Sequence, residues 1–571
     1  MDAIPDVDGL TIGTVLRRQA RRFPDHEALV FPQHAVRLTY GEYDWEVDRV
    51  ARALLALDVR PGDHVAVWAT NWPHWPLLFL GAARIGAVLV TVNPAYRTHE
   101  LSYALRQPDT QVLFLIDRFK TSDYFAMMAE VCPETRRDHL GQLHCSELPE
   151  LRWIVALTED PAPGMLAWSD FLAMGDDVSP VVLAEVEEEL DPMDAVNLQY
   201  TSGTTGFPKG VLLSHRSLLL NAWFVGAGQG LDADDRVCVP VPFYHCFGTV
   251  IGILCCLVHG ATMLVPAEYF DAEAVLDCVE VERATALYGV PTMFVAELEH
   301  ETFPGRDLSS LRTGIMAGSP CPIEVMNRVV NDMGAREMTI AYGLTEASPA
   351  ITQTLTTDPV EVRVSTVGRP LPGVEVRIVD PENGEVLGGE MQGELQSRGH
   401  NTMLGYYNMP EATAEAILEG GWLRTGDLAV RGADGYYRIT GRIKDMIIRG
   451  GENIYPREIE EFLYTHPAVE TAQVFGVPDP RFGEEICAWI RLKRGARMNE
   501  EDMRIFCREH LAHFKVPRYV KFVEDYPLTV TGKIQKFRMR EAAVRELGLE
   551  EVSGSPTSTE EPRGEVAGAP S

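Results

Sequence analysis

The chain has 571 residues, 46% of them hydrophobic and 23% charged, a composition that excludes a fibrous, collagen-like or wholly disordered protein. Lysine and arginine number 51 against 83 aspartates and glutamates, which gives a formal net charge of -32. A charge this negative argues against a nucleic-acid partner or an anionic membrane surface, and we expect neither.

Short β-branched runs alternate with helical patterns over roughly the first three quarters of the chain. Strands are predicted at 65–68, 87–92, 111–116, 195–200, 261–265 and 286–290. One helix is expected to end near residue 85, and another covers 271–281, where apolar residues recur at helical spacing. This alternation predicts an α/β fold whose largely parallel sheets are covered by helices.

The pattern changes after about residue 440. Strands are predicted at 471–477 and 486–492, with one helix starting at Pro456 and another after Asn499, which precedes three acidic residues as a helix cap does. This part of the chain indicates a small α+β module of ordinary domain size. Residues 551–571 are rich in Ser, Pro, Gly and Glu and have little to bury, so a disordered tail is expected there.

The cysteines and the apolar runs indicate a reducing, aqueous compartment. No two of the ten cysteines have C-x-x-C spacing, and most lie in apolar stretches such as 252–258, so we predict reduced core thiols without a zinc site or disulfides. No uninterrupted apolar run approaches the ~20 residues that a membrane span requires. The first residues are acidic where a signal peptide is basic. We expect a cytoplasmic protein with no integral membrane segment.

Lysine is scarce, because only eight of the basic residues are lysines. Scarce lysine beside surplus carboxylate fits a chain made for salty cytoplasm, where charge repulsion is screened. The arginine bias of a GC-rich genome gives the same composition, and both interpretations stay open.

The segment 200–210 reads Tyr-Thr-Ser-Gly-Thr-Thr-Gly-Phe-Pro-Lys-Gly and lies between two predicted strands. Its glycines let the backbone approach an anion, while hydroxyls, backbone N–H groups and Lys209 can bind the anion's oxygens. It lacks the Gly-Lys-Ser/Thr of the Walker A motif and the helix that follows that motif. The alternative is a surface loop of small polar residues, but the order of eleven residues favours a polyphosphate-binding loop.

This segment resembles the signature loop of the adenylate-forming superfamily, which includes acyl-CoA synthetases, luciferases and the adenylation domains of peptide synthetases. Further segments resemble superfamily motifs in the same order, namely 318–320, 341–346, 421–427, 441–445 and 527–534. The resemblance implies a large N-terminal adenylate-forming domain over 1–442, with parallel-rich sheets, helices and a small β-barrel. It also implies a small mobile α+β domain over 443–550, which carries a catalytic lysine and a CoA tunnel.

The resemblance implies an ATP site built from several of these motifs. Its expected residues are Thr201, Ser202, Gly203, Thr204, Thr205, Gly206, Pro208, Lys209, Gly210, Gly318, Ser319, Pro320, Ala341, Tyr342, Gly343, Thr345, Asp427, Arg442 and Lys533. Asp427 can accept hydrogen bonds from ribose hydroxyls, and Arg442 offers a fixed fork of donors for ribose or phosphate oxygens. Glu346 is expected to hold Mg²⁺, which prefers hard oxygen ligands. Each of these residues also has a purely structural alternative. Asp427 would be a turn residue, Glu346 a helix cap or a surface residue, and Arg442 a member of a surface ion pair.

The chemistry implied by the resemblance has two steps. A carboxylate attacks the α-phosphate of ATP, pyrophosphate leaves, and cations with oriented N–H dipoles lower the repulsion between the negative groups. Lys533, His245, Lys209 and Glu346 are the expected catalytic residues. A thiol, that of CoA, then attacks the adenylate after the small domain rotates about a hinge at Lys444. Gly450, Gly451 and Glu452 are expected to bind CoA.

The motifs indicate the chemical class of the substrate acid less directly than they indicate the reaction. His245 lies in the block 242–248, which contains no carboxylate to hold the ammonium group of an amino acid. Gly343 stands where acetate-specific relatives have a tryptophan that closes the pocket, so an open channel is expected. The resemblance is closest to medium-chain acyl-CoA synthetases and bacterial fatty-acyl-CoA ligases, which implies a fatty acid as substrate.

Other functions share the same motifs. An aryl or alicyclic acid ligase would differ only in the shape of its pocket. A luciferase-like oxygenase would also share the motifs, but no residue points to oxygen chemistry. A non-catalytic nucleotide or CoA sensor would have no use for Lys533, Glu346 and a complete phosphate loop. The sequence does not distinguish a monomer from a homodimer.

Overall fold

The computed structural model describes residues 5–133, 142–201, 208–319, 321–450, 452–528 and 534–549. The tail expected over 551–571 lies outside the described residues. Among the described residues, those up to Thr425 and Ala429–Ile439 form one compact unit. Gly426–Leu428 and the described residues from Thr440 onward form a second.

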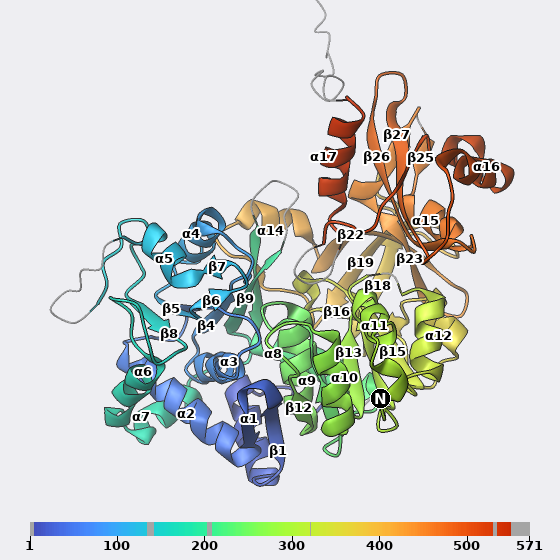
Figure 1. Ribbon diagram of the computed structural model, residues 1–571. Coiled ribbons are helices and arrows are strands. Elements are labelled where there is room, and N and C mark those ends of the chain that lie inside the picture. Colours follow the sequence, from blue (N-terminus) through green and yellow to red (C-terminus); the bar gives the residue numbers. More distant parts are fainter. Residues whose placement is uncertain are drawn as a thin grey trace, which may run out of the picture. The chain divides into compact units, whose positions relative to one another are not determined.

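The first unit contains a sheet of nine strands in the order β17-β16-β15-β14-β13-β11-β12-β1-β2 (Figure 1). The strands are β1 (Glu27–Phe31), β2 (Val36–Thr39), β11 (Arg236–Cys238), β12 (Thr262–Leu264), β13 (Ala286–Gly289), β14 (Thr313–Ala317), β15 (Glu337–Gly343), β16 (Ala350–Gln353) and β17 (Arg369–Pro370). The six strands from β15 to β1 in this order are parallel to one another, and the outer strands β16 and β2 pair with them antiparallel. Helices α10 (Ala272–Val281), α11 (Pro291–Leu298), α12 (Ile323–Asn331) and α13 (Val360–Ser365) pack on this sheet around an apolar cluster.

A second sheet has seven strands in the order β20-β10-β9-β4-β3-β5-β8. The strands are β3 (His64–Trp68), β4 (Val88–Thr91), β5 (Val112–Leu115), β8 (Trp153–Ala156), β9 (Ala195–Thr201), β10 (Lys209–Ser214) and β20 (Gly405–Tyr406). Its helices are α1 (Ile12–Arg22), α2 (Tyr40–Ala56), α3 (His74–Arg84), α4 (Thr98–Arg106), α5 (Tyr124–Val131), α6 (Trp168–Met174) and α7 (Pro180–Glu188), and a small hairpin joins β6 (Arg118–Phe119) to β7 (Ser122–Asp123). The α/β alternation predicted from the sequence is confirmed.

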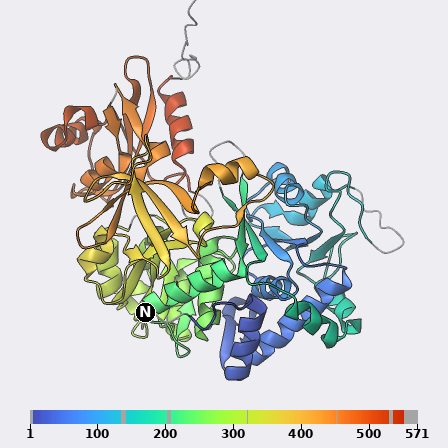
Figure 2. The ribbon, with the colours of Figure 1, turned by 180° about the vertical axis from the view of Figure 1, so that it is seen from behind.

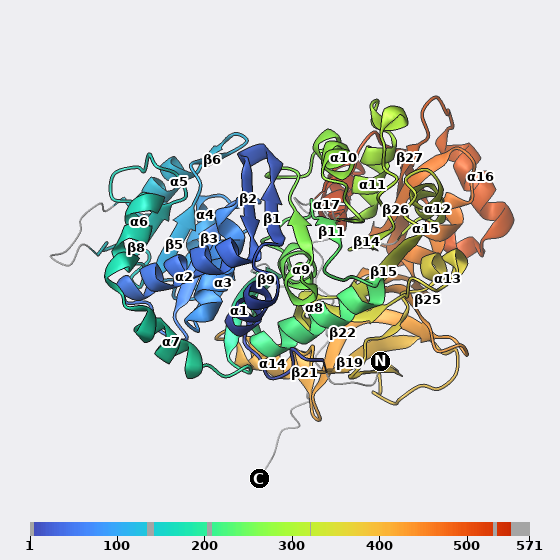
Figure 3. The same cartoon turned by 90° about the horizontal axis from the view of Figure 1, so that it is seen from below.

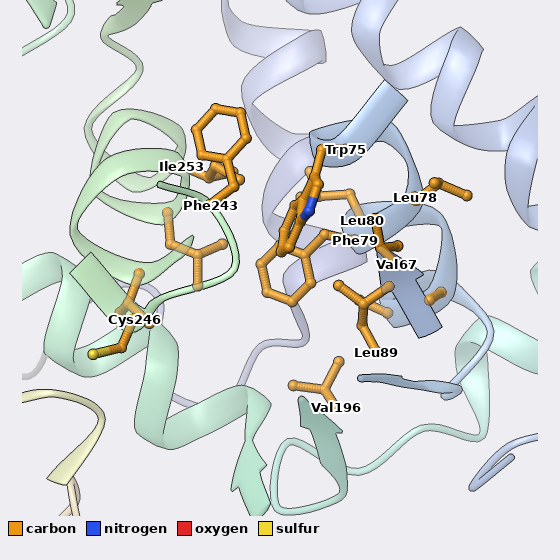
Figure 4. Close-up of a cluster of buried hydrophobic side chains, with 14 of the residues drawn as sticks. Val67, Trp75, Leu78, Phe79, Leu80, Leu89, Val196, Phe243, Cys246 and Ile253 are labelled. Atoms are coloured by element: carbon orange, nitrogen blue, oxygen red, sulfur yellow. The ribbon is translucent and has the colours of Figure 1, made fainter. Parts of the chain in front are cut away.

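The two sheets share a core. Helices α8 (His215–Gln229) and α9 (Cys255–His259) lie between them, and α8 contacts β14, β15 and β16 of the first sheet and β10 of the second (Figure 3). Trp75 of α3 packs against Phe243, with ring centroids 5.7 Å apart, above Leu89 and Val196 of the second sheet (Figure 4). Burying several aromatic and aliphatic side chains at this seam stabilises the unit, at ~1.5–3 kcal/mol for each one.

A third sheet has the order β18-β19-β22-β21, with β23 paired to β22, and is coloured yellow to orange in Figure 2. The strands are β18 (Val374–Val379), β19 (Gly393–Gly399), β21 (Ile417–Leu418), β22 (Trp422–Arg431) and β23 (Tyr437–Arg442), and α14 (Pro410–Ala416) precedes β21. The resemblance implies a small β-barrel, and the strand order of this sheet within the described residues gives no closed ring.

The second unit is the predicted α+β module. Its sheet has the order β25-β24-β27-β26, and β28 pairs with β27. The elements are β24 (Ile447–Arg449), β25 (Glu452–Ile454), β26 (Val469–Asp479), β27 (Gly483–Leu492), β28 (Tyr519–Phe522), α15 (Pro456–Tyr464), α16 (Glu500–His510) and α17 (Lys536–Glu546). Asn499 caps α16 as predicted, because its side chain accepts a hydrogen bond from the backbone N–H of Asp502 at 2.9 Å.

The ten cysteines are thiols that take part in no disulfide, nine of them buried and Cys321 half-buried, in agreement with the prediction of reduced core thiols. Within the described ranges, no helix is both long and apolar enough to cross a membrane.

Candidate active site

Two predicted nucleotide-binding segments follow neighbouring parallel strands of the first sheet. β14 ends at Ala317, which is in register with Ala341 of β15. Gly318, with φ +88°, follows β14, and β15 itself ends at Gly343. The carboxyl ends of parallel strands meet at one edge of a sheet, where open α/β sheets bind ligands. The structure therefore brings 318–319 and 341–343 together, while Pro320 lies outside the described residues.

Gly343 has a structural role that the sequence did not reveal. A Cβ atom at this position would lie 1.8 Å from the carbonyl oxygen of Pro349. Gly343 is thus required by the close packing of β15 against the segment that leads into β16. A side chain at this position would point toward the backbone of Pro349 and Ala350. The structure therefore gives no support to the interpretation that Gly343 opens an acyl channel.

The predicted phosphate loop joins β9 and β10, which form an antiparallel hairpin with Thr201 opposite Lys209. Residues 202–207, which include Ser202, Gly203, Thr204, Thr205 and Gly206, lie outside the described part of the chain. The base of the hairpin is held by α4 and the residue after it: the Tyr103 hydroxyl donates to the carbonyl of Pro208 at 3.0 Å. The Tyr200 hydroxyl donates to Oε1 of Gln107 at 2.9 Å.

Glu346 lies in a short helical turn, Thr345–Ala347, just after β15. Its Oε1 atom accepts a hydrogen bond from the Tyr406 hydroxyl at 2.9 Å and another from the Thr201 hydroxyl at 3.4 Å. Burial and the neighbouring Glu346 carboxylate raise the pKa of Tyr406, so this hydroxyl keeps its proton as a donor. The site thus joins three segments that are distant in the sequence.

Lys209 completes this cluster. Its ammonium nitrogen lies 4.8 Å from the centroid of the Tyr406 ring, within the range of a cation–π interaction. Among the described residues, no carboxylate lies within ion-pair distance of this nitrogen. A half-buried cation without a protein counter-charge, beside the hairpin that bears the phosphate loop, is suited to an anionic ligand.

Tyr406 was missed by the sequence reasoning. It belongs to β20, a strand of two residues that is too short to show any periodicity. No signal in the sequence marks it, because its significance comes from the pairing of β20 with β10.

The oxygens of this cluster fit Mg²⁺. Glu346 offers a hard oxygen ligand, the type that Mg²⁺ prefers. Both hydrogen bonds that the Glu346 carboxylate accepts fall on Oε1, and within the described ranges no hydrogen bond engages Oε2. One remaining carboxylate oxygen suits an ion that usually keeps several waters and shares phosphate oxygens of its substrate.

His245 lies near this cluster through Cys246, whose sulfur is 3.7 Å from the hydroxyl of Thr345. Nδ1 of His245 accepts a hydrogen bond from the backbone N–H of Phe247 at 3.1 Å, which places the ring proton on Nε2 in the neutral form. The segment around His245 is anchored in the core, because the neighbouring residues Phe243 and Cys246 are buried there (Figure 4).

A π-helix, Phe247–Leu254, begins two residues after His245 and was not predicted from the sequence. A Cβ atom at Gly248 would lie 2.2 Å from the carbonyl oxygen of Pro242, so only glycine permits this close approach. π-Helical turns are rare and often occur at functional sites.

The second unit holds the remaining predicted residues. Asp427 is buried, and its Oδ1 accepts a charge-assisted contact from Nε of the more exposed Arg442 at 2.9 Å. Lys444 is exposed in the turn Ile443–Asp445. Gly450 has φ +62° and donates its N–H to the carbonyl of Phe482 at 2.8 Å. Glu452 begins β25 and is exposed, while Gly451 and Lys533 lie outside the described residues.

Comparison with known families identifies the class of protein. The family described as AMP-binding enzyme matches residues 16–407, and the AMP-binding enzyme C-terminal domain matches residues 458–533. The chain belongs to the AMP-binding enzyme family, and the predicted resemblance to adenylate-forming enzymes is confirmed. It is an AMP-forming acid–thiol ligase of the acyl-CoA synthetase class.

Individual relatives cover nearly the whole chain. The protein named "Putative acyl-CoA synthetase YngI" from Bacillus subtilis (strain 168) is 48% identical over 539 residues, which are 94% of this chain and 98% of the relative. The mitochondrial medium-chain acyl-CoA ligase ACSF2 of Danio rerio is 42% identical over 541 residues, 94% of this chain and 89% of its own.

The fold is that of solved adenylate-forming enzymes. The anthranilate CoA ligase AuaEII in complex with anthranoyl-AMP superposes with a TM-score of 0.81 at 28% identity, covering 95% of this chain and 98% of its own. ATP-bound MatB from Rhodopseudomonas palustris gives a TM-score of 0.79 at 28% identity, covering 94% and 99%.

Proposed function

We propose that this protein is a fatty acid–CoA ligase with a preference for medium-chain acids. It converts ATP, a fatty acid and CoA into acyl-CoA, AMP and pyrophosphate through an acyl-adenylate. The observation that carries the proposal is the cluster of Thr201, Lys209, Glu346 and Tyr406 at the base of the phosphate-loop hairpin. The medium-chain preference is supported by relatives named medium-chain acyl-CoA ligase that align with 94% of the chain.

In the first step, Lys209 and the loop 202–207 bind the phosphates of ATP and neutralise the departing pyrophosphate. Mg²⁺ held through Glu346, when bound, screens the negative charge of the phosphates. His245 orients the substrate carboxylate through Nε2–H, and Lys533 bridges that carboxylate and the α-phosphate. No general base is needed, since positioning and charge stabilisation supply the rate.

Several of the predicted segments bind the nucleotide itself. Gly318, Ser319, Pro320 and residues 341–343 bind the adenine, and Asp427 accepts hydrogen bonds from the ribose hydroxyls. Arg442, whose ion pair with Asp427 fixes its guanidinium, contributes further donors. Residues 1–442 then form the adenylate-forming domain, and 443–550 form the domain that bears Lys533.

The second step uses another surface of the small domain. Rotation about Lys444 withdraws Lys533 and presents Gly450, Gly451 and Glu452 to the pantetheine arm of CoA. The glycines allow the chain to approach the ligand closely. The thiol then attacks the acyl carbon, AMP leaves, and the thioester forms.

A ring-bearing acid is the second candidate substrate. The observation that favours it is the likeness to an anthranilate CoA ligase, with a TM-score of 0.81. Every catalytic residue named above is the same for both candidates, and the shape of the pocket makes the difference.

The test is pyrophosphate release with Mg-ATP across a panel of acids, each with and without CoA. The panel contains acetate through palmitate, benzoate, cyclohexanecarboxylate and coumarate. We expect a CoA-dependent maximum among medium-chain fatty acids, because each buried CH₂ adds ~0.8 kcal/mol until the pocket ends. A maximum at a ring acid moves the assignment to the second candidate. No release with any acid, while ATP still binds, favours a nucleotide sensor.

A further inference from the structure

We propose that Tyr406 is a positioning residue, which holds the Glu346 carboxylate in the orientation that binds the divalent cation of Mg-ATP. The inference rests on the proposed function, because it assumes that Glu346 is the metal ligand. Tyr406 does not itself touch the metal or the nucleotide in this proposal. It acts by fixing a group that does.

The position of Tyr406 is itself well defined. Its backbone pairs with Val211 of β10, the strand that begins at Lys209. Its N–H donates to the hydroxyl of Thr413 at 2.9 Å, which anchors β20 to the middle of α14. The side chain therefore has a fixed origin on the strand next to the phosphate-loop hairpin.

The hydrogen bonds to Glu346 are unsymmetrical, and this is the central observation. The hydroxyls of Tyr406 and Thr201 both donate to Oε1, at 2.9 and 3.4 Å. Two donors on one oxygen fix the rotation of the carboxylate and leave Oε2 to a different partner. A carboxylate that binds one cation through one oxygen needs this arrangement, since Mg²⁺ tolerates little deviation from its preferred geometry.

The ring of Tyr406 has a second neighbour that belongs to the same site. The Lys209 ammonium lies 4.8 Å from the ring centroid, so the aromatic face and the hydroxyl of one side chain contact the phosphate-binding cation and the metal ligand. The hydroxyl alone carries the proposed effect on the metal. A substitution by phenylalanine keeps the ring under Lys209 and removes only the donor to Glu346.

The expected size follows from hydrogen-bonded partners of metal ligands in general. Loss of such a partner costs about 10- to 100-fold in metal affinity. We therefore expect Tyr406→Phe to weaken the Mg²⁺-dependent part of nucleotide binding by at least about tenfold. Binding without metal should change less, because the ring and Lys209 remain in place.

The experiment measures binding of α,β-methylene-ATP to the full chain by calorimetry, once with MgCl₂ and once with EDTA. The variants are Tyr406→Phe, Glu346→Gln and their combination. The matched control is Tyr407→Phe, because Tyr407 is the next residue and its hydroxyl bonds to Asp109 at 3.1 Å, outside the cluster. The control should bind like the wild type in both buffers.

Each outcome decides the proposal. The proposal is supported if Tyr406→Phe loses the gain in affinity that Mg²⁺ gives while its affinity in EDTA stays within about twofold of the wild type. In addition, the double variant must bind like Glu346→Gln alone, because the Tyr406→Phe change then has nothing further to remove. An unchanged Mg²⁺ gain overturns it, as does equal weakening in both buffers, which indicates a structural role. Should Tyr406→Phe unfold, Thr201→Val removes the longer of the two bonds and must lower the Mg²⁺ gain by a smaller factor. A wild-type protein without any Mg²⁺-dependent binding refutes the proposed function instead.

Discussion

Glu297 provides a test of the core that is independent of catalysis. It lies on α11 with 0% exposure, and neither carboxylate oxygen has a hydrogen-bond partner among the described residues. Phe294 and Leu298 of the same helix belong to the surrounding apolar cluster. Burial raises the pKa of Glu297 well above its ordinary value of 4.5, because a charge in this environment is not solvated.

The sign of the effect on stability follows from this raised pKa. Well below pH 4.5 the carboxyl is protonated in the folded and the unfolded chain, and its ionisation makes no contribution to stability. Above that pH the unfolded chain releases the proton while the folded chain keeps it, so stability falls by about 1.4 kcal/mol per pH unit until the folded-state pKa is reached.

Glu297→Met removes the titrating group and fills the site with an unbranched apolar side chain. We expect the stability that the variant gains over the wild type to be smallest at pH 5 and to grow by up to about 1.4 kcal/mol per pH unit as the pH rises. The assay is urea unfolding followed by tryptophan fluorescence between pH 5 and 8, which reports mainly on the first unit because eight of the nine tryptophans precede Thr440. Glu299→Met, on the exposed side of the same segment, is the matched control and should show no pH-dependent gain. A gain that is the same at every pH, or a loss of stability near pH 7, would refute the reasoning.

Three further predictions concern the site. Tyr103→Phe removes the hydrogen bond to the Pro208 carbonyl. Because one such bond contributes ~0.5–1.5 kcal/mol, the KM for ATP should rise about three- to tenfold. An unchanged KM in steady-state kinetics would contradict this prediction. Gly343→Ala places a Cβ atom against the Pro349 carbonyl and should lower the free energy of unfolding in urea by roughly 3 kcal/mol. A stable variant that prefers a shorter acid would instead support the interpretation that Gly343 keeps the acyl channel open. Lys533→Ala should slow adenylate formation about 100-fold or more in an acid-dependent pyrophosphate-exchange assay, and adenylate formation at the wild-type rate would disprove the proposed first step.

The sequence by itself determined the fold class and the location of the phosphate-loop hairpin. Strand and helix periodicities are local, so the predicted strands at 65–68 and 286–290 and the helix at 271–281 appear in the structure with small shifts at their ends. The cap at Asn499 is also local, because the side chain bonds to a backbone group three residues away.

Tertiary structure alone decided how the site is assembled. Tyr406 reaches Glu346 only because the two-residue strand β20 adds to β10, and no local pattern marks so short an element. Gly343 has its role because the chain returns in β16 and brings the Pro349 carbonyl against it. Glu297 lies on a helix whose sequence does not show that both carboxylate oxygens will be buried without partners. In each case the role of the residue depends on which other segments pack around it, and local sequence patterns do not specify that packing.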